Sequence, residues 1–396
     1  MRKICAITGY RSDYAKLKSV LKAINANPKL SLEIIALGFH SSQSHGSSID
    51  EIEADGFNVK YRFPTSAHGD SPLDMSKSIG ITISDLCIAL AEIKPDVTLI
   101  VGDRYEIMAA AITSSIANIP VAHIQGGELS GTIDETIRHS ITKLSHIHFP
   151  STELSKQRII LLGENPKFVF NVGCPAIDRI LNQDYMPRKE MNQDPILRRY
   201  LIDLDFDEDY FILIQHPVTT EYGNSYKQFY ESVKAVNEIG IPTLILYPNP
   251  DAGSQGILKA LRSFKSKSRG NMLCIEEAKH IPFPLYLNLL KNCRCLIGNS
   301  SSGIREAHCF NVPVINIGTR QLNRERTPNI IDVPHDSGAI ELELSRILQP
   351  SYKTLMGSGK IDTYGDGTAG ERISKILTNV DLKGSLNKQL FRHENK

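Results

Sequence analysis

Short apolar runs rich in β-branched residues alternate with longer stretches of helical periodicity along almost the whole chain. The runs cover residues 4–8, 33–37, 97–101, 121–124 and 168–172 in the first half, and residues 211–214, 243–247, 272–275, 295–297 and 313–317 in the second. Several of these runs are almost continuously apolar, as strands must be when helices cover both faces of their sheet. Since helical stretches of about 10–15 residues separate the runs, the pattern predicts an α/β fold built from parallel sheets.

A polar, irregular stretch interrupts this alternation near the middle of the chain. Residues 181–195, with the sequence LNQDYMPRKEMNQDP, have the composition of a linker. A chain of 396 residues is also too long for one ordinary domain. We therefore expect two Rossmann-like, doubly wound domains at residues 1–182 and 183–367, with a helix near residues 368–380 that completes the first domain. The tail after about residue 380 is polar, and we expect it to fray.

Composition and charge exclude several classes of protein. The 45 basic and 44 acidic residues are evenly mixed, so no basic face for nucleic acid is indicated. No window of about 18 apolar residues exists, and we expect no membrane span. The seven cysteines are odd in number and scattered, which favours reduced, buried thiols and a cytoplasmic protein.

Polar side chains follow the predicted strands of the first half, where ligands bind to doubly wound sheets. Arg11 lies in a turn with one glycine after the first strand, which disfavours a dinucleotide fingerprint. The arginine suits a phosphate contact or an exposed surface position. Asp103 and Arg104 follow the strand at 97–101. They suit either a ligand contact or a solvated turn that caps the next helix.

The next strand leads into Gln125, two glycines and Glu128, and the glycines allow the backbone to approach a ligand closely. A helix start follows, in which Asp134 lies in the first turn, where the helix dipole stabilises a carboxylate. Arg138 is one turn further along, and we expect it to pair with Asp134. Four histidines, at positions 123, 139, 146 and 148, match no metal-ligand spacing, so we expect a hydrogen-bonded scaffold and no metal.

The strand ends of the second half carry groups that suit an anion. His216 follows one strand and is either a site residue that titrates near neutrality or a structural histidine. Ser300 and Ser301 open a helix after another strand, where hydroxyl and backbone N–H groups suit a diphosphate. The alternative is a serine-rich helix cap. Arg320 follows the last predicted strand and suits a phosphate or a sugar oxygen.

These strand-end groups together predict a nucleotide-sugar enzyme with two domains facing a cleft, an arrangement like that of the glycosyltransferase-B fold. They do not choose the reaction. The choice rests on seven motifs that lie between residues 102 and 321. They are GDRYE at 102–106, HIQGGELSGTIDETIRHSITKLSHIH at 123–148, GCPAID at 173–178, QHPVTT at 215–220, YPNPDAGS at 247–254, GNSSSGIREA at 298–307 and INIGTRQ at 315–321.

In these motifs the chain closely resembles the hydrolysing UDP-N-acetylglucosamine 2-epimerases of bacterial sialic-acid pathways. The motifs appear in the order of that family, and the resemblance extends over residues 3–367. The resemblance implies that UDP-N-acetylglucosamine and water give UDP and N-acetylmannosamine, the first step of sialic-acid synthesis, through a 2-acetamidoglucal intermediate. It implies no metal and no cofactor, and a homodimer or homotetramer. Carboxylates suit this chemistry, because they stabilise the positive charge that forms as UDP leaves and they move protons.

Residue roles also follow from the resemblance. Asp103, Asp134 and His216 match family residues with catalytic roles, and Gln125 occupies a position that is glutamate in many members. Positions that hold the UDP-sugar correspond to Arg11, Arg104, Glu128, Asn249, Ile281, Ser300, Ser301, Glu306 and Arg320. Glu306 suits the ribose hydroxyls, and Ile281 is expected to act through its backbone beside uracil.

Gln125 is the one departure from the family pattern, because an amide is neither a general base nor a general acid. Either Asp103 and Asp134 carry the protons, or Glu128 contributes, or the mechanism is modified. Relatives that act on a UDP-2,4-diacetamido-2,4,6-trideoxyhexose in legionaminic-acid synthesis also tend to lack that glutamate, so this sugar stays an alternative. A non-hydrolysing 2-epimerase, a glycosyltransferase of the same fold and a non-catalytic nucleotide-sugar binding protein are the remaining alternatives.

Overall fold

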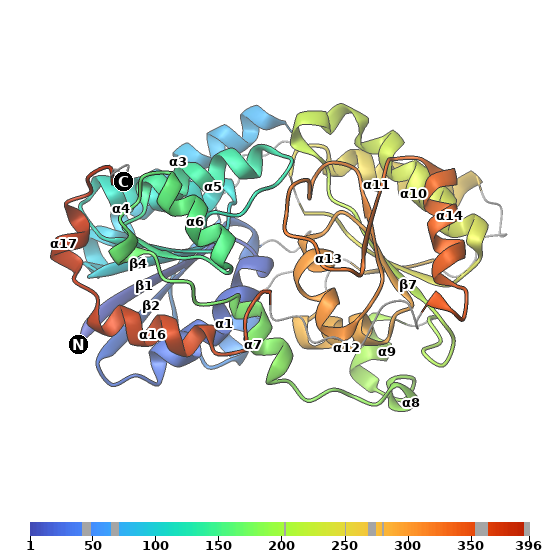
Figure 1. The fold of residues 1–396 in the computed structure, drawn as a ribbon, viewed down its shortest axis with the longest axis horizontal. Helices are drawn as coiled ribbons and strands as arrows, with labels where there is room; N and C mark the ends of the chain where they lie inside the picture. The colour runs from blue at the N-terminus through green and yellow to red at the C-terminus, as the bar shows by residue number, and fades with distance from the viewer. Residues whose placement is uncertain are drawn as a thin grey trace, which may run out of the picture.

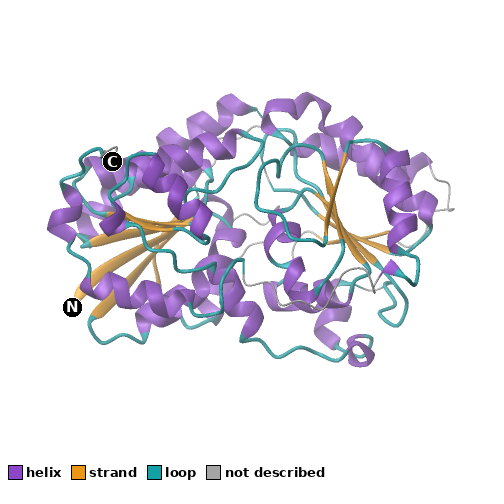
Figure 2. Cartoon of the chain, viewed as in Figure 1, coloured by secondary structure: helices purple, strands orange, loops and turns teal. Residues whose placement is uncertain are grey.

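The computed structural model contains two parallel sheets of six strands each (Figure 1). It describes residues 1–41, 49–64, 71–201, 203–249, 251–267, 275–278, 281–352 and 363–391. The strand orders are β3-β2-β1-β4-β5-β6 and β12-β11-β10-β7-β8-β9, and all pairings are parallel. Helices lie on both faces of each sheet (Figure 2). The predicted fold class is therefore confirmed.

The first sheet contains the N-terminal strands, and two of its inner strands, at residues 97–101 and 121–124, are buried along their whole length. Its strands are β1 (Arg2–Thr8), β2 (Leu30–Leu37), β3 (Val59–Phe63), β4 (Val97–Val101), β5 (Val121–Ile124) and β6 (Ile147–Phe149). The connecting segments are α1 (Arg11–Asn25), η1 (Gly38–Ser41), α2 (Ile49–Ala54), α3 (Pro72–Ile93), α4 (Tyr105–Ile116), α5 (Ile133–Leu144) and α6 (Glu153–Leu161). Because Val101 is in register with Ile124, Asp103 and Gln125 leave the sheet from neighbouring strands at the same edge.

The second sheet repeats this arrangement. Its strands are β7 (Phe211–Ile214), β8 (Thr243–Leu246), β9 (Ile275–Ala278), β10 (Cys295–Gly298), β11 (Val314–Ile317) and β12 (Ile330–Val333). Its helices are η4 (Thr219–Asn224), α10 (Ser225–Ile239), α11 (Ser254–Lys267), α12 (Phe283–Asn292), α13 (Ser301–Arg305), η5 (Ala307–Phe310) and α14 (Ser337–Ile347). Gly298 is in register with Ile214, so the segments that follow β7 and β10 also leave their sheet side by side.

The chain passes from the first sheet to the second and then returns (Figure 1). It crosses through α7 (Pro175–Leu181), α8 (Arg188–Met191) and α9 (Pro195–Tyr200), so the predicted linker contains a short helix. It returns as α16 (Ala369–Asn379), which packs against α1 with Ile373 and Leu377 in the core of the first sheet. The predicted domain boundaries at residues 182 and 367 stay a proposal.

Two local predictions differ from the structure. Residues 168–172 do not form a strand. They follow η3 (Pro166–Phe168) and make a single bridge, between Val169 and His148, because β6 offers only three residues for pairing. The tail after residue 380 forms α17 (Leu382–Leu386) and then docks, with the Lys388 ammonium donating to the Ser145 carbonyl at 2.6 Å. Residues 272–274 of another predicted strand lie outside the described residues.

None of the helices in the described ranges combines the length and the apolar character needed to cross a membrane.

Candidate active site between the two sheets

The first half of the molecule is the sheet of β1–β6 with its helices, and the second half is the sheet of β7–β12 with its helices. A cavity lies between the two halves, and segments that follow strands of both sheets line it. Seven of the residues predicted to contact the nucleotide sugar line it: Arg11, His216, Asn249, Ile281, Ser300, Ser301 and Glu306. Their segments follow β1, β7, β8 and β10 or adjoin α12, so the parallel topology brings them together. The other predicted residues, Asp103, Arg104, Gln125, Glu128, Asp134 and Arg320, do not line this cavity.

Part of the cavity lining is apolar and partly aromatic. Ile281, Phe283, Tyr286 and Leu246 belong to it, and the rings of Phe283 and Tyr286 lie 6.2 Å apart. The Tyr286 hydroxyl is 2.6 Å from the Ser302 hydroxyl, which fixes the ring. Flat, apolar walls with a few polar groups suit a planar heterocycle.

The cavity lining also includes cationic and hydroxyl groups. Arg11, with its guanidinium 5.1 Å from the centre of the Tyr10 ring, lines the cavity together with Ser300 and Ser301. Ser300 is the N-cap of α13, and its side chain accepts a hydrogen bond from the Ser302 N–H at 3.3 Å. These groups are the donors that a phosphate oxygen binds in proteins.

His216 is held in one tautomer at the cavity wall. Its Nδ1 accepts a hydrogen bond from the Asn249 N–H at 3.0 Å, so Nε2 carries the hydrogen of the neutral ring. Burial lowers the pKa of His216 well below its usual value, and Arg320 and Arg11 lower it further. The ring is therefore a neutral N–H donor near pH 7, which suits binding a phosphate better than transferring a proton.

Asp103 is paired with arginines from both halves of the molecule. The Arg138 Nε donates to the Asp103 carboxylate at 3.0 Å, and the Arg324 Nη2 lies 3.8 Å from the same oxygen. Burial alone would raise the pKa of Asp103, but Arg138, Lys16 and Arg324 outweigh burial and hold the pKa well below its usual value. This carboxylate stays ionised at neutral pH.

Asp134 has the opposite environment. Its partner is Arg320 of the second half, whose Nη2 donates to the Asp134 carboxylate at 3.3 Å. Burial raises the pKa of Asp134, and the nearby Asp103 charge adds to the rise that Arg320 opposes. The predicted pairing of Asp134 with Arg138 is wrong, because Arg138 reaches Asp103 on the neighbouring strand end instead of its neighbour on α5. Carboxylates with opposite pKa shifts are typical of sites that divide charge stabilisation from proton transfer.

Glu128 is buried, and its side chain joins the two halves of the molecule. Its carboxylate accepts hydrogen bonds from Arg305 and Arg324, both in the second half. Burial would raise the pKa of Glu128, but Arg305, Arg324 and Arg138 lower it to about 2. A carboxylate with so low a pKa is a poor proton carrier at neutral pH.

Gln125 lies buried beside a thiol. Its Nε2 donates to the Cys174 Sγ at 3.1 Å, and its Oε1 has no hydrogen-bond partner within the described part of the chain. The backbone of Gln125 is left-handed, with φ 66°, a conformation that is uncommon for residues other than glycine and clusters at functional sites.

Arg104 is fully engaged away from the cavity. Its Nε and Nη2 each donate to the Glu106 carboxylate at 3.1 Å, and its Nη1 lies 3.2 Å from Asp251 of the second half. The guanidinium also lies 5.1 Å from the centre of the Tyr10 ring. In this conformation Arg104 joins the two halves, and its predicted contact with UDP stays a prediction.

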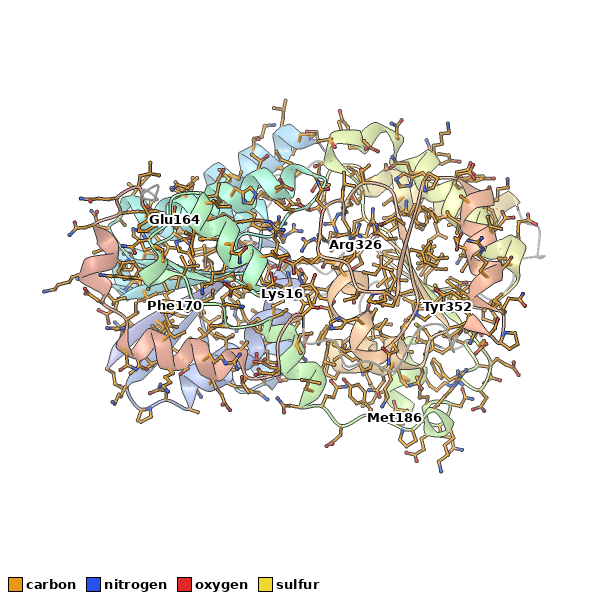
Figure 3. All side chains as sticks on the ribbon, viewed as in Figure 1. Lys16, Glu164, Phe170, Met186, Arg326 and Tyr352 are labelled. Carbon is orange, nitrogen blue, oxygen red and sulfur yellow. The ribbon has the colours of Figure 1, made fainter. Side chains whose placement is uncertain are left out.

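Three cations of the site were missed in the sequence. Lys16 of α1 lines the cavity and lies near the boundary between the halves (Figure 3). Burial lowers its pKa, and Arg305 lowers it further. A signal for Lys16 was present, because it lies one helical turn after Ser12, which follows Arg11 and also lines the cavity. For Arg305 and Arg324 the sequence holds no comparable signal, since both act across the boundary between the sheets.

No group of three or more histidine, cysteine, aspartate or glutamate residues in the described ranges is arranged to hold a metal ion.

The fold and the cavity define a class of protein, the two-sheet α/β proteins with an arrangement like glycosyltransferase B. Within it, the chain belongs to the UDP-N-acetylglucosamine 2-epimerase family, whose model matches residues 22–378. Membership makes the protein an enzyme that acts on a nucleotide sugar.

Three relatives align with almost the whole chain. A Legionella pneumophila protein named UDP-N,N'-diacetylbacillosamine 2-epimerase (hydrolyzing) is 36% identical and covers 98% of both chains. A Campylobacter jejuni protein named GDP/UDP-N,N'-diacetylbacillosamine 2-epimerase (hydrolyzing) is 32% identical, covering 98% of this chain and 99% of its own. A Neisseria meningitidis UDP-N-acetylglucosamine 2-epimerase is 33% identical over 96% of each. These names do not single out the predicted sialic-acid pathway.

Solved structures share the fold. A Methanocaldococcus jannaschii UDP-GlcNAc 2-epimerase, solved with UDP-GlcNAc and UDP, superposes with a TM-score of 0.77 at 22% identity, covering 95% of this chain and 99% of that one. The Neisseria meningitidis enzyme bound to UDP-GlcNAc gives 0.76 at 18% identity, with the same coverage.

The tautomer of His216 is open to a direct test. We expect the His216 ring to stay neutral, with hydrogen on Nε2, as the pH falls from 8 past the ordinary histidine pKa of about 6.5, because burial and the neighbouring arginines disfavour the charged ring. Two-bond ¹⁵N–¹H correlation spectra measure this at each pH, with His216→Gln assigning the signal. A titration of that signal with a midpoint near 6.5 would contradict the assignment.

Proposed function

We propose that the protein is a hydrolysing 2-epimerase, which converts a UDP-2-acetamido sugar and water into UDP and the free sugar inverted at C2. One observation carries this proposal. A cavity lined by apolar and aromatic side chains, Arg11, His216 and serine hydroxyls lies at the boundary between the sheets, where Asp103 and Asp134 face Arg324 and Arg320 of the second half, and the pKa values of these two carboxylates shift in opposite directions. UDP elimination needs both functions: a fixed negative charge beside the developing cation, and a base for the C2 proton.

In the first step the C1–O bond breaks, and its electron pair leaves with UDP. The sugar gains oxocarbenium character, which the ionised Asp103 stabilises. The positive charge makes C2–H acidic, and Asp134 removes this proton, so the C2–H electron pair becomes the C1–C2 double bond. Arg11, the Nε2–H of His216 and the Ser300 hydroxyl stabilise the departing diphosphate.

In the second step water adds to the 2-acetamidoglucal. The water oxygen bonds to C1 and loses one proton to solvent. The C1–C2 electron pair takes a proton from solvent at C2 on the face opposite to the one that was deprotonated, which inverts the configuration, and Asp134 releases the proton of the first step to solvent. Gln125 takes no part in these proton transfers, since an amide has no proton to exchange near neutral pH. The low pKa of Glu128 argues against that residue as a substitute, and the low pKa of Asp103 argues against it in the same way, so Asp134 accepts the C2 proton.

Two sugars are candidates, and the motif GELSGTIDE favours N-acetylglucosamine. Two of the relatives are named for UDP-N,N'-diacetylbacillosamine, and Gln125 in place of glutamate favours this diacetamido sugar as well. The identities of 36% and 33% lie close together, so we propose both nucleotide sugars as substrates to compare, the diacetamido sugar first. The cytoplasmic location and the homodimeric or homotetrameric state stay predictions.

Proton NMR of the protein with each nucleotide sugar in D₂O tests the reaction. We expect UDP together with a free sugar that is inverted at C2 and carries deuterium there, because the returning proton comes from solvent. One sugar should be preferred by about 10-fold or more in kcat/KM, which a buried polar difference readily supplies.

Other outcomes of the same experiment identify the alternatives. An epimerised UDP-sugar without release of UDP indicates a non-hydrolysing epimerase. UDP release without inversion indicates transfer or simple hydrolysis. An unchanged spectrum with both sugars leaves a binding protein and contradicts the proposal.

The division of labour between the carboxylates predicts different pH profiles for two variants. In the wild type kcat/KM should rise with pH through the raised pKa of Asp134, since only the ionised form accepts the C2 proton. Asp134→Asn should lower kcat by about 10²-fold or more and remove this acid limb. Asp103→Asn should lower kcat by about 10²-fold but keep the limb. Rates of UDP release between pH 4.5 and 8 measure both.

Asp332→Asn is the control, because Asp332 is exposed and pairs with Arg326 outside the cavity. An acid limb that survives in Asp134→Asn and disappears in Asp103→Asn would reverse the two roles.

A further inference from the structure

Arg324 carries a positive charge from the second half of the molecule to two carboxylates of the first. It lies in the segment between β11 and β12, and its guanidinium is buried. One terminal nitrogen donates to the Glu128 carboxylate, and the other lies 3.8 Å from the Asp103 carboxylate. A cation at this distance in a buried setting acts strongly on the charge it faces.

The other arginine on Asp103 does not depend on the second half. Arg138 is held on α5 by the Glu128 carbonyl at 2.7 Å and by the Ser130 hydroxyl at 3.3 Å, all within the first half. Arg138 therefore binds Asp103 whether or not the halves are together. Arg324 reaches Asp103 only when the second half lies against the first.

The segment that carries Arg324 rests directly on the first half. The Gly131 N–H donates to the Arg320 carbonyl at 3.2 Å, and a Cβ on Gly131 would lie only 1.8 Å from the Thr319 carbonyl oxygen. Glycine thus permits the backbones to touch, and with the Glu128 contact it fixes where Arg324 enters the site.

We propose that Arg324 is a positioning residue for Asp103, which completes the orientation and charge pairing of this carboxylate only when the two halves are together. Closure of the two halves is thereby linked to the chemical step. The inference rests on the proposed function, because it is in that reaction that Asp103 faces the developing cation. Burial lowers the pKa of Arg324 to about 10, and the charges of Arg305 and Arg138 lower it as well, while Glu128 raises it. The guanidinium is therefore charged at neutral pH.

Kinetics of Arg324→Gln test the proposal. We expect kcat for UDP release to fall between about 10- and 100-fold, as for groups that misplace the reacting centre by a small distance. KM should change less than about 3-fold, and so should the Kd for UDP measured by calorimetry, because Arg324 does not line the UDP cavity. Arg324→Lys should recover a substantial part of the lost kcat, since it restores the charge but not the fork.

Arg326→Gln is the matched control. Arg326 lies two residues further along, pairs with Asp332 within the second half and is labelled in that half (Figure 3), so its loss should leave kcat unchanged. A wild-type kcat in Arg324→Gln overturns the proposal. So does a loss confined to KM, or a loss that lysine does not relieve at all.

Glu128→Gln separates the two partners of Arg324. We expect a smaller loss of kcat than in Arg324→Gln, since Arg324 keeps its contact with Asp103 in this variant. If Glu128→Gln reproduces the whole loss, Arg324 acts through Glu128 and not through Asp103, and the proposal is wrong.

Hydrogen exchange gives a readout that needs no turnover. With UDP bound, the segments around residues 102–104 and 126–132 should exchange faster in Arg324→Gln than in Arg326→Gln, because their cross-boundary contact is lost. Equal exchange overturns the contact itself. Absence of any UDP release by the wild-type protein with both sugars would instead defeat the proposed reaction, while the exchange result would stand.

Discussion

Carboxylates buried between two protein layers must be paired with cations, since an isolated buried charge costs several kcal/mol. Here the pairing crosses the boundary between the sheets: Glu128 meets Arg305 and Arg324, and Asp134 meets Arg320. These pairs hold the strand ends of the two sheets in one arrangement. They also act on the protonation of the acids: Arg305 and Arg324 lower the pKa of Glu128, and Arg320 opposes the rise in the pKa of Asp134.

The two halves contribute different parts of the site. The first half supplies the acids, Asp103 and Asp134, on the strand ends and on the helix that follows. The second half supplies the neutral Nε2–H of His216, the hydroxyls of Ser300 and Ser301, and the apolar walls near Ile281. A nucleotide sugar suits this division, with its base on the second half, its phosphates between Arg11 of the first half and His216 and Ser300 of the second, and its sugar against the first. Arg324 belongs to the second half but places its positive charge beside Asp103 and Glu128 of the first. The charge pairing of these acids therefore depends on whether the halves are together.

Much of the fold followed from the sequence because buried parallel strands are nearly continuous apolar runs. The runs at 97–101 and 211–214 became β4 and β7. The edge strands β3 and β12 were missed, since half of their residues are only partly buried and their apolar signal is weak. The run at 168–172 was apolar enough for a strand but met a short edge with room for one bridge.

The cavity residues were also predictable, because parallel topology gathers whatever follows the strands. The positions of Arg11, His216 and Ser300 at the cavity could be predicted without knowing any distance between them. The ion pairs were not predictable, because local spacing favoured Arg138 with Asp134 while the fold brought Arg138 to Asp103. Arg305 and Arg324 depend on how two separately folded sheets face each other, which no local pattern encodes.

A crystal structure of the Asp134→Asn variant with an unhydrolysed UDP-sugar tests the central claim most directly. The account predicts uracil beside the apolar side chains near Ile281 and the diphosphate among Arg11, His216 and Ser300. It also predicts C1 and C2 of the sugar within about 3.5 Å of the side chains at 103 and 134. A diphosphate bound elsewhere, or a sugar directed away from these two residues, would contradict it.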